Sequence, residues 1–250
     1  MMFNFAGEFK RELMDMGKMF QDNIYPWWED IYIYIRRLDN DFTWNTLPIV
    51  VLSIYKFIGI ERSFSIQMAN IFKMVYFTNS IHAYIKDDTE GQEYNRELQF
   101  NILIGDYFFG RVLKQLNDLR ADKLLPLFSK LICEINEGMV MKHRLGAADN
   151  EVLEKTKASF YSTAFLTAAE LTDIEGQEKE LLAKLGNNIG MALELLNDKA
   201  PLEDIYEFVD FSELFFKEIN QKRMLTNSNM EKLIKELHDI TYGIEKVVVV

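Results

Sequence analysis

The stretch ILIGDYFFGRVLKQL, residues 102–116, decides which fold class we expect for this chain. Its apolar positions, such as Phe109 and Leu113, recur at the spacing of one helix face, which predicts a packed helix. Gly105 and Asp106 interrupt this helix. A glycine in a helix interior costs about 1 kcal/mol relative to alanine, and a buried carboxylate requires a partner. We therefore expect another element to approach closely at Gly105.

The same helical spacing recurs along most of the chain. The 250 residues are 48% hydrophobic and include only 4 prolines and 12 glycines, which favours long elements over many turns. No alternating strand pattern persists. We expect an all-α fold with residues 1–250 as one domain, a large bundle of about ten helices. The expected helices span residues 4–22, 27–37, 46–59, 63–86, 94–118, 122–144, 150–173, 176–197, 201–220 and 228–246.

Charge and composition exclude several classes of protein. The net charge of −11 disfavours nucleic-acid binding, because a phosphate backbone would be repelled. The single cysteine, Cys133, sits in an apolar run and is expected to be buried, and His82 is expected to be a hydrogen-bonded core residue. The three histidines have no metal-ligand spacing. No apolar run is long enough for a membrane span, and the first residues do not form a signal peptide, so we expect a cytoplasmic protein.

The stretch 102–116 also resembles the LAGDYL helix of the trans-polyprenyl diphosphate synthases. Four more segments resemble motifs of that family, in its order and at about its spacing. These segments are TWNTLPIVVLSIYKFIG at 43–59, FKMVYFTNSIH at 72–82, EINEGMVM at 134–141 and LGNNIGMALELLND at 185–198. The last corresponds to YGxxLGxAFQxxDD. The resemblance implies an isoprenoid-synthase-like helical bundle.

The resemblance also implies a metal-dependent reaction, so the residues that would bind the metal can be looked for in this sequence. The family ionises an allylic diphosphate, and two DDxxD motifs hold the Mg²⁺ that binds this leaving group. In this chain Ala83 and Tyr84 stand where the first two aspartates of one motif would be. Asn197 and Asp198 begin the second motif, and Pro201 ends the turn that would present its last carboxylate.

The family's phosphate-binding cations are also absent from their motif positions. GKRxRP is replaced by TWNTLP at 43–48, and the family's Lys-Thr pair falls on Ser162–Thr163. We therefore expect no catalytic residue, no metal site and no cofactor in this chain. A displaced metal site at Asp87, Asp88 and Glu90 is a second interpretation, but a solvated turn explains these residues more simply.

Degenerate metal motifs in an otherwise complete frame resemble the small subunits of heteromeric heptaprenyl or hexaprenyl diphosphate synthases. The resemblance implies a non-catalytic subunit, required for activity and for chain-length control in menaquinone side-chain synthesis. It would pair with a catalytic subunit that carries DDxxD motifs and Mg²⁺, or form a homodimer without that partner. Two alternatives stay open: a stand-alone isoprenoid-binding or scaffold protein, and an active synthase with unusual ligands.

The resemblance further implies where a partner and a prenyl chain would bind. In the family, the helix at 102–116 and the helix after it form the subunit interface, of about 2,000 Å² or more in an obligate complex. The interface residues expected here are Tyr107, Phe108, Phe109, Val112, Leu116, Met139 and Val140. The candidates for lining a prenyl tunnel are Phe77, Thr78 and Ile81.

Overall fold

The computed structural model describes residues 4–25, 28–83, 96–223 and 228–248. All regular elements in these ranges are helical, which confirms the predicted all-α fold. The α-helices are α1 (Lys10–Ile24), α2 (Trp28–Arg37), α3 (Phe42–Ile58), α4 (Arg62–Ala83), α5 (Arg96–Asp118), α6 (Leu125–Val140), α7 (Asp149–Leu153), α8 (Ser159–Leu171), α9 (Gly176–Asn197), α10 (Leu202–Arg223) and α11 (Asn229–Val248).

Four short helical segments extend or join these helices. The 3₁₀ segments η1 (Asn4–Phe9) and η2 (Asp122–Leu124) precede α1 and α6. The π-helical segment η3 (Met141–Leu145) extends α6, and a second one, η4 (Glu154–Ala158), joins α7 to α8. The described residues therefore form ten continuous helical stretches, as the sequence predicted.

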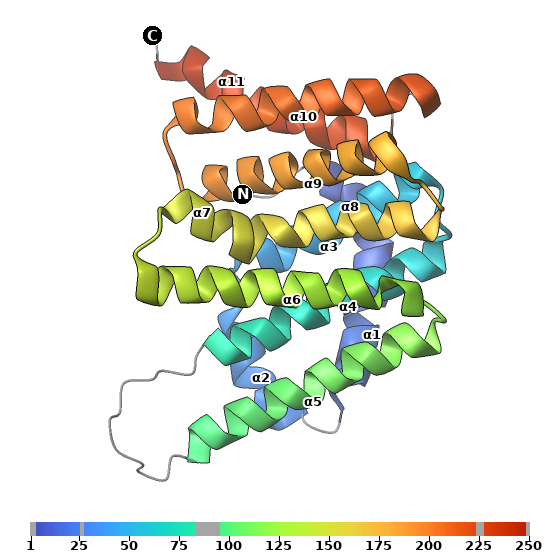
Figure 1. Cartoon of the computed structure of the whole chain (residues 1–250), viewed down its shortest axis with the longest axis vertical. Helices are drawn as coiled ribbons and strands as arrows, with labels where there is room; N and C mark the ends of the chain where they lie inside the picture. The colour runs from blue at the N-terminus through green and yellow to red at the C-terminus, as the bar shows by residue number, and fades with distance from the viewer. Residues whose placement is uncertain (1–3, 26–27, 84–95, 224–227, 249–250) are drawn as a thin grey trace.

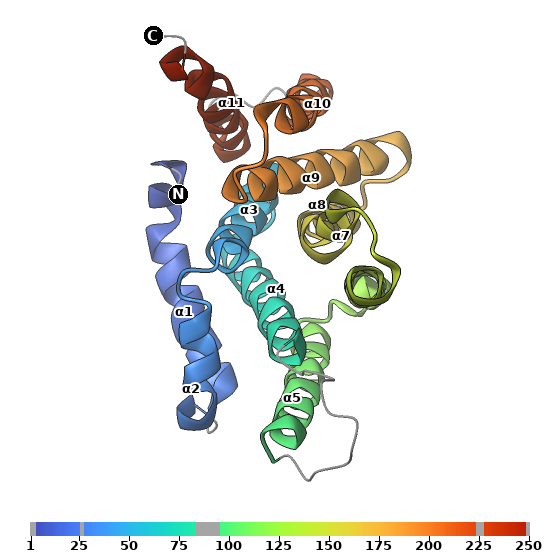
Figure 2. The same cartoon turned by 90° about the vertical axis from the view of Figure 1, so that its left-hand side faces the viewer.

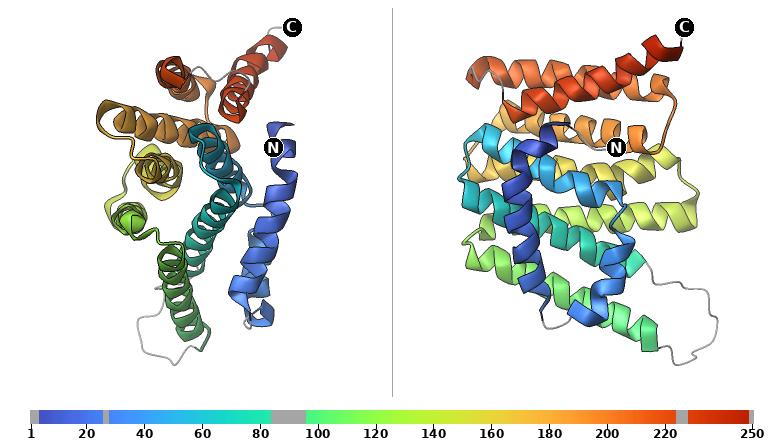
Figure 3. Two further views of the ribbon diagram at one scale, coloured as in Figure 1. Left: turned by 90° about the vertical axis from the view of Figure 1, so that its right-hand side faces the viewer. Right: turned by 180° about the vertical axis from the view of Figure 1, so that it is seen from behind.

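Helices α3 and α4 run through the middle of the bundle (Figure 2). On one side they are covered by α1 and α2, and on the other by α8, α9 and α6 (Figures 2 and 3). Helices α10 and α11 pack at one end of the molecule and α5 at the other (Figure 1). None of the helices in the described ranges is long and apolar enough to cross a bilayer.

Helix α3 is buried along nearly its whole length, and most residues between its caps are apolar. The carboxylate of Asp41 caps its first turn by accepting a hydrogen bond from the amide of Trp44, at 2.7 Å. Gly59 ends the helix in the left-handed conformation, with φ of 91°. Inside the helix, Pro48 has no amide hydrogen, so one carbonyl of the preceding turn lacks its helical donor.

Two glycines allow α8 and α9 to pack in close contact. A Cβ atom on Gly190 would lie 2.7 Å from Cδ2 of Tyr161, and one on Gly186 would lie 2.8 Å from Cδ2 of Phe165. These are the two glycines of the LGNNIG motif. Their role in this structure is steric. Because neither position has a Cβ atom, Tyr161 lies close to the α9 backbone and can reach side chains one turn further along α9.

Gly105 has the same role between α4 and α5. A Cβ atom at this position would lie 2.3 Å from Nε2 of His82, so the expected close approach is confirmed. The His82 ring stacks on Phe109, with centroids 5.8 Å apart, and its Nε2 lies 3.9 Å from the carboxylate of Asp106. The expectation for His82 was wrong in part: the residue is half-buried, and Nε2 has no hydrogen-bond partner.

The expectation for Cys133 was also wrong, because this residue is exposed. It lies on α6, which turns Leu131 and Ile135 into the core. Position 133 is two residues from each of them and therefore points away from that face.

Candidate functional site

Three of the segments that carry the family resemblance, 43–59, 72–82 and 185–198, meet where α3 begins, between α4, α8 and α9. Their polar side chains form one cluster, which we name the polar centre. It consists of Asp41, Thr43, Tyr76, Lys157, Tyr161 and Glu194, with Lys73 beside it.

Glu194 is the carboxyl group at the bottom of the polar centre. It is 3% exposed, and its Oε1 accepts hydrogen bonds from the Thr43 and Tyr161 hydroxyls, each at 2.8 Å. Burial raises the pKa of Glu194, while the charge of Lys157 and the two hydroxyl donors oppose the rise. Both hydroxyls donate their only hydrogen to this oxygen, so Thr43, Tyr161 and Glu194 form one hydrogen-bonded group.

Tyr76 joins the other side of the centre. Its hydroxyl contacts both carboxylate oxygens of Asp41, at 2.9 and 3.0 Å, and accepts a hydrogen bond from Nζ of Lys157. The Lys157 ammonium also lies 4.5 Å from the centroid of the Tyr76 ring. Burial and the charge of Asp41 both raise the pKa of Tyr76. The Tyr76 hydroxyl, on α4, therefore connects Asp41 at the start of α3 with Lys157 in η4.

Lys73 fills the gap that Pro48 leaves in α3. Pro48 cannot donate to the carbonyl of Trp44, and Nζ of Lys73 donates to that oxygen instead, at 3.3 Å. The same ammonium lies 3.7 Å from the centroid of the Trp44 ring. Burial lowers the pKa of Lys73 to about 7, although the charges of Asp39 and Asp41 oppose this.

The degenerate motif positions lie at the ends of the helices that carry the polar centre. Ala83 is exposed at the end of α4, and Asn197 and Asp198 are exposed at the end of α9, where Asn197 donates to Asp198 at 3.1 Å. Tyr84 lies outside the described residues, as do Asp87, Asp88 and Glu90. Within the described ranges, no three His, Cys, Asp or Glu side chains are placed to hold a metal ion. Ala83 and Asn197 do not supply the carboxylates that Mg²⁺ requires.

Sequence reasoning missed the lysine of the polar centre. It assigned the family's Lys-Thr pair to Ser162–Thr163, but Ser162 faces α9 and donates to the Ala183 carbonyl at 3.3 Å. The cation in the centre is Lys157, within the π-helical segment η4. A π segment shifts the helical phase, so the pattern of α8 could not be extended backward to position 157.

The tunnel candidates are core residues in this structure. Phe77 packs against Phe20, Trp44 and Phe108, with ring centroids 5.7, 6.1 and 5.4 Å apart. Thr78 is buried and donates to the Met74 carbonyl, and Ile81 is buried beside them. Aromatic rings therefore occupy the space beside these residues, which do not line an open tunnel here.

The expected partner interface requires a correction. Phe108, Val112 and Leu116 are buried in the chain's own core, because α5 turns this face toward α4, and so they cannot meet a partner. Tyr107 and Val140 are exposed as expected, and Phe109 and Met139 are partly buried. The apolar side chains that α5 and α6 expose, which we name the α5–α6 face, are Ile102, Leu103, Tyr107, Leu113, Leu125 and Val140.

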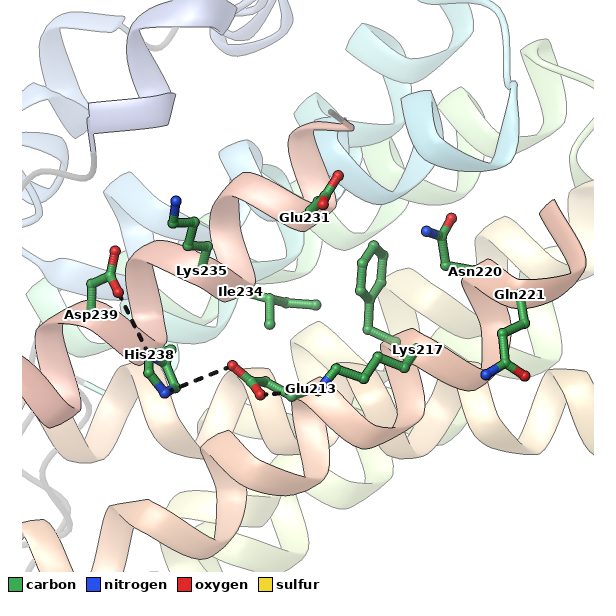
Figure 4. Close-up of a pocket in the computed structure, with 10 residues that line it drawn as sticks. Glu213, Lys217, Asn220, Gln221, Glu231, Ile234, Lys235, His238 and Asp239 are labelled. Atoms are coloured by element: carbon green, nitrogen blue, oxygen red, sulfur yellow. Dashed lines mark ion pairs between the residues drawn. The ribbon is translucent and has the colours of Figure 1, made fainter. Parts of the chain in front are cut away.

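A groove that the sequence did not indicate lies between α10 and α11. It encloses about 850 Å³, and Figure 4 shows Ile234 in its middle. Glu213 lies between His238 and Lys217, with 4.0 Å to Nε2 of His238 and 3.5 Å to Nζ of Lys217. Acids and bases alternate around this groove, so its charges are largely matched within the chain.

Known proteins resemble this chain weakly in sequence and more extensively in fold. No family model matches the sequence. A curated relative, solanesyl diphosphate synthase 2, chloroplastic, from Arabidopsis thaliana, is 23% identical over 145 residues, which cover 53% of this chain. The match spans about a third of that relative's length, 35%.

Solved structures match over nearly the whole chain. Polyprenyl synthase from Caulobacter crescentus, complexed with calcium and isoprenyl diphosphate, has a TM-score of 0.69 at 14% identity, over 95% of this chain and 97% of that one. The geranyl diphosphate synthase small subunit from Antirrhinum majus has a TM-score of 0.68 at 13% identity, over 94% and 97%. The fold is that of the polyprenyl diphosphate synthases. This isoprenoid-synthase-like fold is the one the sequence predicted.

Proposed function

We propose that this chain is a non-catalytic, regulatory subunit of a heteromeric long-chain polyprenyl diphosphate synthase. It would act in the cytoplasm beside a catalytic subunit that carries both DDxxD motifs and Mg²⁺. In this proposal it is required for the partner's activity and for product length in the synthesis of the menaquinone side chain.

The proposal rests on one combination of features. The fold is intact, but residues without a carboxylate stand at positions of both metal-binding motifs. Ala83 and Asn197 offer no carboxylate for Mg²⁺ at the helix ends. The lysine that remains in the polar centre, Lys157, is bonded to Tyr76, which in turn contacts Asp41. A diphosphate would have to displace these partners without the help of a metal ion.

The α5–α6 face supports the presence of a partner. Leu103, Leu113 and Val140 are 68%, 54% and 55% exposed. Leu113 also lines an apolar depression of about 290 Å³ between α5 and α6, together with residues such as Phe109 and Ile132. An apolar depression bordered by exposed apolar side chains is typical of an interaction surface. The similarity in fold to a protein described as a small subunit is consistent with this use.

The first test is the activity of the isolated chain. Incubated with farnesyl diphosphate, isopentenyl diphosphate and Mg²⁺, the chain alone should release no diphosphate and form no longer prenyl product. Mixed with a catalytic subunit encoded beside it, the chain should raise that subunit's long-chain product at least tenfold. Clear turnover by the chain alone would contradict the proposal and favour an active synthase with unusual ligands.

The second test locates the partner surface with matched variants. Leu113→Asp changes a leucine on the α5–α6 face that is 54% exposed, and Leu214→Asp changes one on α10 that is 55% exposed. Only Leu113→Asp should weaken the complex, by tenfold or more in Kd, because it buries an unpaired charge at the interface. Both variants should keep wild-type circular dichroism. Equal binding by the two variants would show that this face is not the interface.

The alternative is a stand-alone isoprenoid-binding or scaffold protein. It predicts saturable binding of a prenyl chain by the isolated protein and no change in any synthase's product length. Fluorescence titration with a prenyl alcohol probe, run beside the activity test, distinguishes the two functions.

A further inference from the structure

A second polar group, partly buried, lies between α1, α4 and α5, away from the polar centre. We name it the amide cluster; it consists of Asn23, Asn70, Arg111 and Gln115. Oε1 of Gln115 accepts from Nδ2 of Asn70 at 2.8 Å and from Nδ2 of Asn23 at 3.4 Å. Nη2 of Arg111 donates to Oδ1 of Asn23 at 3.3 Å. Figure 3 shows α1, which carries Asn23, alongside α4.

Three buried atoms of the amide cluster have no hydrogen-bond partner among the described residues. They are Nε of Arg111, Nε2 of Gln115 and Oδ1 of Asn70, and Asn70 is 0% exposed. Buried polar atoms in folded proteins are nearly always hydrogen-bonded, and groups of unpaired ones mark places that hold water or an ion. Three such atoms on interconnected side chains indicate one shared occupant.

The charge of Arg111 decides which occupant fits. A guanidinium stays protonated in proteins. Arg111 is partly exposed, but its Nε is buried, and a buried N–H of a cation favours an acceptor that carries negative charge. Arg111 forms no ion pair with a carboxylate of the described residues; its one hydrogen bond is to the Asn23 amide. Arg111 and Gln115 are one helical turn apart on α5, so their unpaired N–H groups lie on the same face.

We infer that the N–H groups of Arg111 and Gln115 hold a small monovalent anion of the halide class between α1, α4 and α5. The anion compensates the guanidinium where α5 packs against α1 and α4. Oδ1 of Asn70 is an acceptor, so a lone water molecule is the competing occupant. The inference does not depend on the proposed function, because these residues lie outside the polar centre and the α5–α6 face.

Thermal unfolding of the full chain tests the site. The Tm in sodium chloride or bromide should exceed the Tm in sodium gluconate of equal ionic strength by about 3 °C, since gluconate is too large to enter. Arg111→Met should abolish this difference. The control, Lys114→Met, removes the same charge from an exposed position on the same helix, where Lys114 pairs with Asp118, and should keep the difference.

A second variant serves if Arg111→Met fails to fold. Gln115→Glu keeps the oxygen that Asn70 and Asn23 donate to, and it places a carboxylate oxygen where the unpaired Nε2 stood. An internal anion then faces Arg111, so the halide response should disappear while the protein stays folded. Crystals grown in bromide should show an anomalous peak beside Nε of Arg111 in the wild type. A water without anomalous signal, together with equal Tm values in halide and gluconate, would overturn the inference.

Discussion

The polar centre and the amide cluster both join several helices, but they differ in how their charges are met. In the polar centre, Glu194 and Asp41 accept from hydroxyls, and Lys157 donates to Tyr76. In the amide cluster, which is partly buried, Arg111 pairs with no carboxylate of the described residues, and three buried atoms find no partner among them. The charges of the polar centre are therefore matched within the chain, whereas the amide cluster leaves donors for the proposed anion.

The largest expected effect comes from removing the carboxyl group of the polar centre. Glu194→Leu leaves the buried hydroxyls of Thr43 and Tyr161 without an acceptor, and each unpaired group costs about 1–3 kcal/mol. We expect a loss of about 3 kcal/mol in the free energy of unfolding, measured by urea denaturation. Glu180→Leu, at an exposed position of the same helix, is the control and should change it by less than about 0.5 kcal/mol. Equal losses would show that the centre contributes no special stability.

The second effect tests the buried amine of Lys73 through pH. Its pKa in the folded protein is about 7, below the ordinary value of 10.5, so the folded protein disfavours the charged form. Stability should therefore rise with pH above 7, where only the unfolded chain still binds the proton. Lys73→Met should have its highest Tm relative to wild type at pH 6, and this advantage should fall by about 3 °C by pH 9. A constant difference across this range would contradict the lowered pKa.

A smaller effect of opposite sign is expected at Glu194. Its pKa is raised on folding, so the stability it contributes is present below the unfolded pKa and is lost as pH rises through the folded value. Glu194→Gln keeps the oxygen that accepts from Thr43 and Tyr161 and stays neutral. Its Tm should exceed that of the wild type by about 2 °C at pH 7.5, and the two should converge near pH 4. If Glu194→Gln still had the higher Tm at pH 4, the difference would come from packing and not from the ionisation of Glu194.

The smallest effect is expected at Asn23 of the amide cluster. Its two hydrogen bonds are long, at 3.3 and 3.4 Å, and their loss exposes half-buried groups to water. Asn23→Ala should cost less than about 1 kcal/mol in urea denaturation and leave the halide response in place. If this variant lost the halide response, Asn23 would have to be counted with Arg111 and Gln115 among the residues that hold the anion.

Much of the fold could be predicted because its signals are local. The apolar run from Leu47 to Leu52 predicts the helix at 46–59, which the structure extends to Phe42, where Asp41 caps it. Gly105, Gly186 and Gly190 interrupt helical patterns where neighbouring helices come close. The loss of carboxylates at Ala83 and Asn197 could also be read from the sequence, because the motif frame around them is preserved.

The sequence by itself thus determined the helices and the loss of carboxylates at Ala83 and Asn197, since periodicity and residue type act over one or two turns. Only the tertiary structure decided that Phe108 faces the core and Leu113 the outside, because α5 is apolar on more than one face. It also decided that Lys157 reaches Tyr76, and that Gln115 on α5 meets Asn70 on α4. These partners lie 81 and 45 positions apart in the sequence, where no local pattern extends and only the packing of helices brings side chains together.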